Sequence, residues 1–151
     1  MTGEEVVVVD QHLTDFIDSY HSALNMFFAG NPEPAKQLYS RREDASLGNP
    51  FGPFEIGWPH VEAAMERAAA SYREGHATGF ESVATHVTPE LAYLVEVERF
   101  EAKVGGAKDF VSGALRVTSV LRPEDGHWKV VHRHADPITT PRAAASVVPP
   151  E

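Results

Sequence analysis

The sequence predicts an α+β fold in one domain, because helical periodicity fills its first half and strand periodicity its second. Early in the chain, apolar residues recur at spacings of three and four, which is the pattern of one buried helix face: Leu13, Phe16, Ile17, Tyr20, Leu24, Phe27 and Phe28. After residue 75 the period becomes two, as in strands joined by hairpins. Helices that precede a sheet in this way must cover one of its faces.

Three helices are expected before the sheet. The first carries the apolar stripe and ends at Gly30-Asn31-Pro32, because glycine suits the position after a helix and proline cannot continue its hydrogen bonds. A short second helix is expected over residues 34–39. A third is expected over residues 58–74, with Pro59 in its first turn and Gly75 closing it. The valines at 6–9 fit either an extended arm or an early helical turn.

Four strands in an antiparallel meander are expected in the second half. Turn sequences separate these segments, which cover residues 79–87, 91–104, 109–122 and 128–134. Before them, residues 45–57 are so rich in Gly and Pro that only a brief strand and an irregular loop fit, and such loops often carry function. Residues 137–151 hold four prolines, so a domain of residues 1–136 with a flexible tail is predicted.

Composition excludes several classes of protein. The formal net charge of −9 and the absence of clustered Lys and Arg oppose binding to nucleic acid or to anionic membranes. Zero cysteines exclude disulfides and thiolate chemistry and favour a cytoplasmic location. The first ten residues lack the pattern of a signal peptide, and no apolar run approaches the roughly 20 residues that span a bilayer.

Three stretches match a known family jointly in their order and spacing. They are Tyr20-His21-Ser22-Ala23-Leu24-Asn25, the loop from Asp44 to Gly52, and the segment from Arg116-Val117-Thr118 to His132-Arg133-His134. Together they resemble the SnoaL-like and ketosteroid-isomerase-like proteins of the nuclear transport factor 2-like superfamily. The last stretch also resembles the association domain of calcium/calmodulin-dependent kinase II.

This resemblance implies a shape and a type of ligand. In the family, a strongly curved, mixed or antiparallel sheet wraps around three helices and leaves a conical cavity, into which a tyrosine of the first helix points. A small apolar or carbonyl-bearing ligand is therefore expected, with no cofactor. The resemblance also implies a homodimer formed through the outer face of the sheet.

One position departs from the family pattern. Ketosteroid isomerases carry their proton-transferring carboxylate at the position of Asn49, and an amide cannot accept and return a proton near neutral pH. Their second carboxyl would fall near Arg116 or Val117, and neither residue offers one. Steroid isomerisation by that route is disfavoured, although Asp44 or Glu55 beside the loop could supply another base.

Tyr20 and Arg116 are two of the candidate catalytic residues. Tyr20 could present its hydroxyl to a ligand oxygen, or it could be an aromatic core residue on the apolar stripe. Arg116 lies within a predicted strand, where a guanidinium needs a carboxylate, an aromatic face or an anionic ligand. It could bind a ligand oxygen, or it could pair with Glu96 or Glu98.

The third candidate, His132, lies two residues from His134, so both side chains project to one side of the last strand. The pair could transfer protons or hold a metal, but no third ligand stands at a recognised spacing, and we expect no metal site. A purely structural pair is the alternative. Asn49, Phe51 and Trp58 are further expected ligand contacts, although Trp58 could simply pack at the start of its helix.

Two functions remain after these steps. One is a small-molecule-binding protein that acts as an acid–base enzyme of the isomerase, cyclase or dehydratase type, with Tyr20, Arg116 and His132 in the site. The other is a non-catalytic module for ligand binding or dimerisation, favoured by the missing carboxylate at Asn49. The fold alone cannot choose between them.

Overall fold

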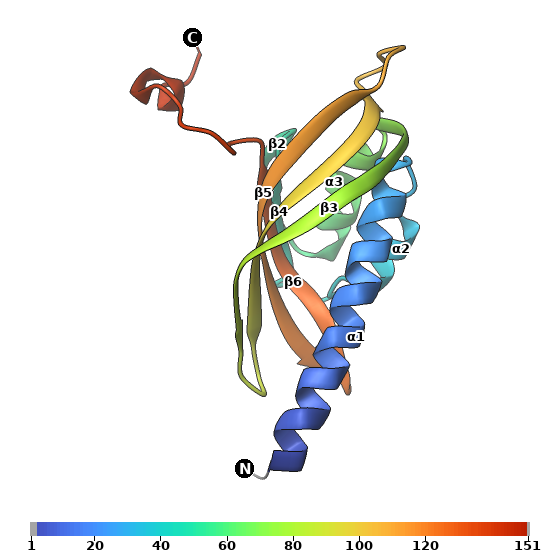
Figure 1. Cartoon of the computed structure of the whole chain (residues 1–151), viewed down its shortest axis with the longest axis vertical. Helices are drawn as coiled ribbons and strands as arrows, with labels where there is room; N and C mark the ends of the chain where they lie inside the picture. The colour runs from blue at the N-terminus through green and yellow to red at the C-terminus, as the bar shows by residue number, and fades with distance from the viewer. Residues whose placement is uncertain (1–2, 151) are drawn as a thin grey trace.

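In the computed structural model, which describes residues 3–150, three α-helices lie on one side of a six-stranded curved sheet (Figure 1). The helices are α1 (Gly3–Phe28), α2 (Glu33–Leu38) and α3 (Trp58–Ala69). The strands are β1 (Ser46–Asn49), β2 (Gly52–Ile56), β3 (Tyr72–Val87), β4 (Ala92–Val104), β5 (Val111–Glu124) and β6 (His127–Asp136). The predicted α+β class and curved sheet are confirmed.

The strand order explains how distant parts of the chain meet. Neighbouring strands follow the order β2-β1-β6-β5-β4-β3, and β3 to β6 form the expected antiparallel meander. The short β1 instead pairs in parallel with β6, with Ser46 opposite His132 and Gly48 opposite His134. The Gly- and Pro-rich segment therefore lies beside the last strand.

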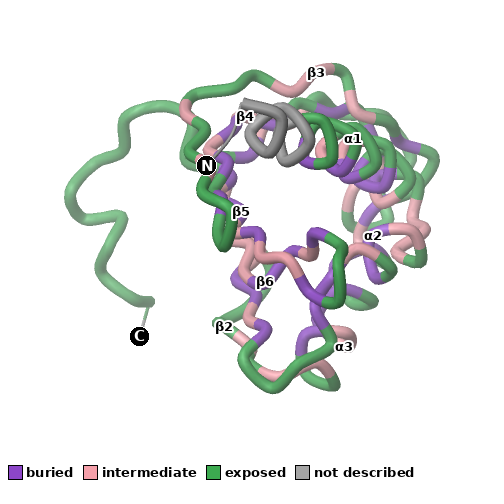
Figure 2. The backbone as a smooth tube through the Cα atoms, turned by 90° about the horizontal axis from the view of Figure 1, so that it is seen from below, coloured by how far each residue is buried: buried purple, intermediate pink, exposed green. Residues whose placement is uncertain are grey.

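Seen from below, the sheet bends into an arc whose open side is covered by α1, α2 and α3 (Figure 2). Buried aromatic residues fill one end of this arc. The ring of Phe28 from α1 stacks on Phe100 of β4 at 4.5 Å between centroids and meets Tyr72 of β3 edge-on at 5.2 Å. These contacts join the first helix to β3 and β4 at one edge of the sheet.

The start of β3 differs from the prediction. The third helix ends at Ala69 instead of residue 74, and Tyr72 already pairs with Val104 as the first residue of the strand. Burial of the Tyr72 ring against Phe28 explains this early start, because the tertiary contact outweighs local helix preference. The valines at 6–9, left open above, belong to α1.

Gly75 is a strand residue and not a helix stop. A Cβ atom on it would lie 2.5 Å from the Phe28 carbonyl oxygen and 2.6 Å from the Glu101 carbonyl oxygen.

We expect Gly75→Ala to lower the free energy of unfolding by about 1–3 kcal/mol, because backbone atoms must move apart. Gly79→Ala is the matched control, since a Cβ atom at that position of the same strand would meet nothing within 4 Å. Equal midpoints in urea for the two variants would contradict this.

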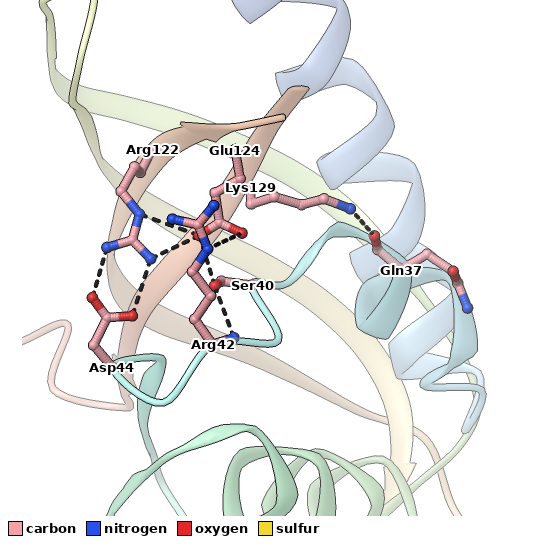
Figure 3. A network of polar contacts seen from close by, with 7 residues as sticks. All are labelled: Gln37, Ser40, Arg42, Asp44, Arg122, Glu124 and Lys129. Atoms are coloured by element: carbon pink, nitrogen blue, oxygen red, sulfur yellow. Dashed lines mark hydrogen bonds and ion pairs between the residues drawn. The ribbon is translucent and has the colours of Figure 1, made fainter. Parts of the chain in front are cut away.

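A polar network fastens the segment after α2 to the hairpin between β5 and β6 (Figure 3). Arg122 donates to both oxygens of Asp44, at 2.7 and 3.0 Å, and its Nη2 donates to Glu124 at 2.7 Å. Ser40 donates to the same Glu124 oxygen at 2.7 Å. Hydrogen bonds to Arg122 hold the pKa of Asp44 below its usual range. Burial opposes ionisation of Glu124, but its bonds to Arg122 and Ser40 outweigh burial and lower its pKa.

These two lowered pKa values predict a loss of stability in acid. A carboxyl whose pKa is depressed by folding stabilises the protein fully above its unfolded pKa, about 4, and stops doing so as the pH falls through its folded pKa. The stabilisation that these two carboxyls contribute should therefore be level from pH 7 to about pH 5 and fall below about pH 4. Urea titrations at several pH values measure this. In Arg122→Gln the fall should be shallower, and an equally steep fall would contradict the assignment to Asp44 and Glu124.

Residues 137–150 run away from the body of the protein and are exposed throughout (Figure 1). They include a short 3-10 helix at Ala144–Val147. The division into a domain of residues 1–136 and a tail stays a prediction. None of the helices within residues 3–150 combines the length and apolar character needed to cross a membrane.

Candidate functional site

A narrow hollow lies between the inner face of the sheet and the helices. The space free of protein atoms measures about 590 Å³, and this volume includes a part that is open to solvent. The centre of a water molecule fits within about 50 Å³ of it. Its walls are mostly apolar and come from all three helices, from the β1–β2 segment and from the sheet: Leu24, Phe27, Phe28, Ala35, Leu47, Pro50, Phe51, Met65, Ala68, Leu115 and Ala135. Tyr20, Tyr39, Asn49, Tyr72 and Arg133 complete the lining.

A hydrogen-bonded group of four side chains forms the polar end of the hollow. Arg133 of β6 donates to both oxygens of Glu98 on β4, at 2.8 and 2.7 Å. Its Nη1 also donates to the hydroxyl of Tyr20 on α1 at 2.8 Å. The Tyr20 hydroxyl lies 2.7 Å from the hydroxyl of Ser119 on β5. One helix and three strands thus meet at this point.

Strand alternation places these groups on the inner face. Successive side chains of a strand point to opposite faces, so Arg133 and Ala135 face the hollow while His132 and His134 face outward. The same rule puts Ser119 inward and Arg116 outward on β5. The register of β5 and β6 sets Ser119 directly opposite Arg133. The long Arg133 side chain reaches Glu98 on β4, two strands away.

Burial sets the charge state of this polar end. The Glu98 side chain is 0% exposed and that of Arg133 only 13%, so each needs the other as its counterion. Burial opposes the charge on Arg133, but Glu98 and the hydrogen bonds outweigh it and keep the Arg133 pKa well above its usual value. Burial raises the pKa of Tyr20 despite the nearby Arg133 charge, so Tyr20 keeps its proton at neutral pH.

Two more tyrosines line the hollow. The Tyr39 hydroxyl donates to the backbone carbonyl of Ser46, and burial raises its pKa. Burial raises the pKa of Tyr72 to about 12, and its hydroxyl has no hydrogen-bond partner within residues 11–150, whose side chains the structure describes. In this part of the chain, every fully buried side-chain polar atom has a hydrogen-bond partner. Because the Tyr72 hydroxyl has no such partner, it is not fully buried. Tyr72 is also one of the residues that line the hollow.

A family model for the SnoaL-like domain matches residues 13–139. The chain belongs to the SnoaL-like domain family. The resemblance seen in the sequence is thereby confirmed.

Solved structures share the fold of this SnoaL-like chain. A nuclear transport factor 2-like superfamily protein from Salmonella enterica serovar Typhimurium is 19% identical with a TM-score of 0.70, and the match covers 95% of this chain and 99% of that one. A ketosteroid isomerase-like protein from Erwinia carotovora atroseptica is 12% identical with a TM-score of 0.66, covering 92% and 100%. A candidate calcium/calmodulin-dependent protein kinase type II association domain from Thiobacillus denitrificans is 18% identical with a TM-score of 0.61, covering 81% and 91%. No curated protein matches the chain.

The SnoaL-like structure brings three of the residues expected at the site to the hollow. Tyr20 stands at its polar end, and Asn49 and Phe51 lie where the β1–β2 segment borders it. The Asn49 side-chain oxygen accepts a hydrogen bond from the Phe51 backbone N–H at 2.9 Å, which shapes the turn. The Phe51 ring meets Tyr72 at 5.8 Å and is half exposed.

Trp58 and Arg116 lie elsewhere. The Trp58 ring packs beside Tyr39 at 6.4 Å between centroids, with the guanidinium of Arg41 over it at 4.8 Å, and it does not line the hollow. Arg116 is exposed on the outer face, where its Nη2 donates to Asp136 at 2.9 Å. Its partner is therefore neither of the glutamates suggested by the sequence.

The two histidines also lie outside the hollow. His132 Nδ1 is 2.8 Å from the hydroxyl of Ser46, and burial, with a contribution from His134, lowers the His132 pKa. His134 lies 3.5 Å from an Asp136 oxygen, and the Phe54 ring lies near both imidazoles. No group of three metal-ligating side chains occurs in the described part of the chain.

Sequence reasoning missed Arg133, and it considered Glu98 as a partner of Arg116 instead. Arg133 lies between the two histidines that were singled out, so alternation alone places it on the face opposite to theirs. A charged residue on the inner face of a strand needs a partner, and Glu98, on β4 two strands away, is the inward carboxylate that Arg133 contacts. This pairing of inward charges on two strands was the signal available in the sequence.

Proposed function

We propose that this SnoaL-like protein binds a small, mostly apolar molecule that carries one hydrogen-bonding oxygen. The observation that carries the proposal is an apolar hollow whose lining includes the hydrogen-bonded Tyr20–Arg133 pair and Tyr72. Apolar walls supply affinity through burial, and a few fixed polar groups orient the ligand. The ligand oxygen would lie toward Arg133, with its carbon skeleton between Leu24, Phe27 and Met65.

The lining favours binding over proton transfer. Within residues 3–150 the residues that line the hollow include no histidine, aspartate or glutamate. The nearest carboxylate, Glu98, is fully buried and has both oxygens bonded to Arg133. A general base must reach the proton that it removes, and no side chain here is placed to do so. Asn49, in the position of the isomerase carboxylate, supports the same proposal.

Filling the hollow tests this function. Ala68 lines it and Ala63 does not, although both belong to α3. We expect the wild type to bind cyclohexanone, seen as shifts of hollow-lining amides in two-dimensional NMR. Ala68→Leu should weaken binding at least about tenfold because the added carbons occupy the space. Ala63→Leu should bind as the wild type does. Equal binding by both variants, or no binding by the wild type, would contradict the proposal.

A second function, self-association, is supported by the outer face of the sheet. The helices cover only the inner face (Figure 1). The outward side chains of β4 and β5 include Val95, Val97 and Val120, which are half-buried in the single chain. We propose that two copies pair through this face as a homodimer. Light scattering at micromolar concentration should give twice the mass of one chain, and a monomer mass would rule the dimer out.

A further inference from the structure

We infer that the hollow selects uncharged ligands with a hydrogen-bond-accepting oxygen, such as ketones, aldehydes or amides, and rejects carboxylates of the same shape. The inference rests on the proposed ligand-binding function and adds the chemical class of the ligand. It comes from one juxtaposition: the only cation lining the hollow within residues 3–150 is already neutralised from behind by Glu98.

The first step is the net charge at the polar end. Arg133 contributes one positive charge and Glu98 one negative charge, and the bidentate contact at 2.7 and 2.8 Å makes them a closed pair. Lys36 on α2 is another buried cation, but it does not line the hollow. Its Nζ lies 2.5 Å from Glu66 and 3.0 Å from Glu33. The surroundings of a ligand are therefore neutral overall.

The second step is the number of free donors. A guanidinium has five N–H bonds, and three are used by the contacts of Arg133 with Glu98 and Tyr20. Two N–H bonds of Arg133 and the hydroxyl of Tyr72 remain without a protein partner in the described chain. A carbonyl oxygen accepts one or two hydrogen bonds, so these donors match a neutral carbonyl.

The third step is the cost of a charged ligand. A carboxylate in the hollow would lose its hydration among apolar walls, and a buried charge without its own counterion is strongly disfavoured. Its attraction to Arg133 would be offset by repulsion from Glu98, which lies on the other side of the guanidinium. An isosteric ketone loses far less hydration and keeps the same hydrogen bonds.

The experiment compares ligands that differ only in charge. Butan-2-one and propionate have the same number of non-hydrogen atoms, as do acetophenone and benzoate, so the two pairs probe two sizes. At pH 7 we expect each ketone to bind the wild type at least about tenfold more tightly than its carboxylate, measured by NMR titration, because only the carboxylate adds an unpaired buried charge.

Glu98→Gln frees the charge of Arg133 and should remove the preference for ketones. Its affinity for the carboxylates should rise at least about tenfold, while that for the ketones changes little. Glu96→Gln is the matched control, because Glu96 is on the same face of β4 but bonds His21 and does not line the hollow. Circular dichroism verifies folding, and the wild-type comparison holds even if Glu98→Gln does not fold.

The outcomes separate the inference from the proposed function. Ketones and carboxylates that bind the wild type equally would overturn the charge selection but leave ligand binding intact. A wild type that binds no member of either pair, and no cyclohexanone, would overturn the proposed function and the inference together. A folded Glu98→Gln variant that still rejects carboxylates would overturn the role of Glu98.

Discussion

Replacing Arg133 by methionine is expected to lower the free energy of unfolding by about 3–5 kcal/mol, because it leaves a buried carboxylate without a counterion. Glu98 is 0% exposed and makes its hydrogen bonds to Arg133. Tyr20 would lose a donor at the same time. The free energy of unfolding is measured by urea titration at pH 7.

A second substitution separates the buried charge from lost packing. Adding Glu98→Leu to Arg133→Met removes both charges, and the double variant should regain much of the lost stability, since apolar residues can replace a buried ion pair. Arg116→Met is the surface control: the Arg116 side chain is 55% exposed on the outer face, so a smaller change is expected. A double variant as unstable as Arg133→Met would contradict the assignment to an uncompensated charge.

Replacing Phe28 by alanine should also lower the free energy of unfolding by about 3–5 kcal/mol, because a large aromatic side chain is removed from a close-packed cluster. Phe28 is 1% exposed and contacts the rings of Tyr72 and Phe100. Phe54→Ala is the control, since the Phe54 side chain is 65% exposed. Thermal unfolding followed by circular dichroism would show the difference.

Phe28 also lines the hollow, so this variant has a second readout. The cavity left by the ring would join the hollow and admit larger ketones. If Phe28→Ala folds, its affinity for acetophenone relative to butan-2-one should rise. A stability close to that of the wild type would show that the aromatic cluster contributes less than its burial implies.

The fold was predictable because its elements repeat a simple period. The apolar stripe on α1 indicates one buried helix face, and the alternation of apolar and polar residues in β4 to β6 indicates one buried sheet face. The end of α3 was not predictable, because the burial of Tyr72 against Phe28 and Phe100 is a contact between distant segments. Local signals such as Gly75 then suggest the wrong boundary.

The site was predictable only in part, because the sequence gives the spacing of side chains but not the face that is buried. Tyr20 could be singled out from its helix stripe and from the family resemblance. Between Arg133 and its two histidine neighbours, the choice depends on which face of β6 meets α1, and that depends on packing of the whole sheet. The same uncertainty hid the role of Glu98.

The contact between Glu98 and Arg133 spans 35 positions of the chain, and within residues 3–150 the neighbours of β1 in the sheet are β2 and β6. During synthesis, a chain that has not yet reached residues 127–136 holds an inward carboxylate with no cation and a β1–β2 hairpin with no neighbour. Contacts of such long range form late in folding. The hollow therefore closes only when the sheet is complete, and a chain stopped before β6 would expose its apolar inner face to chaperones and proteases.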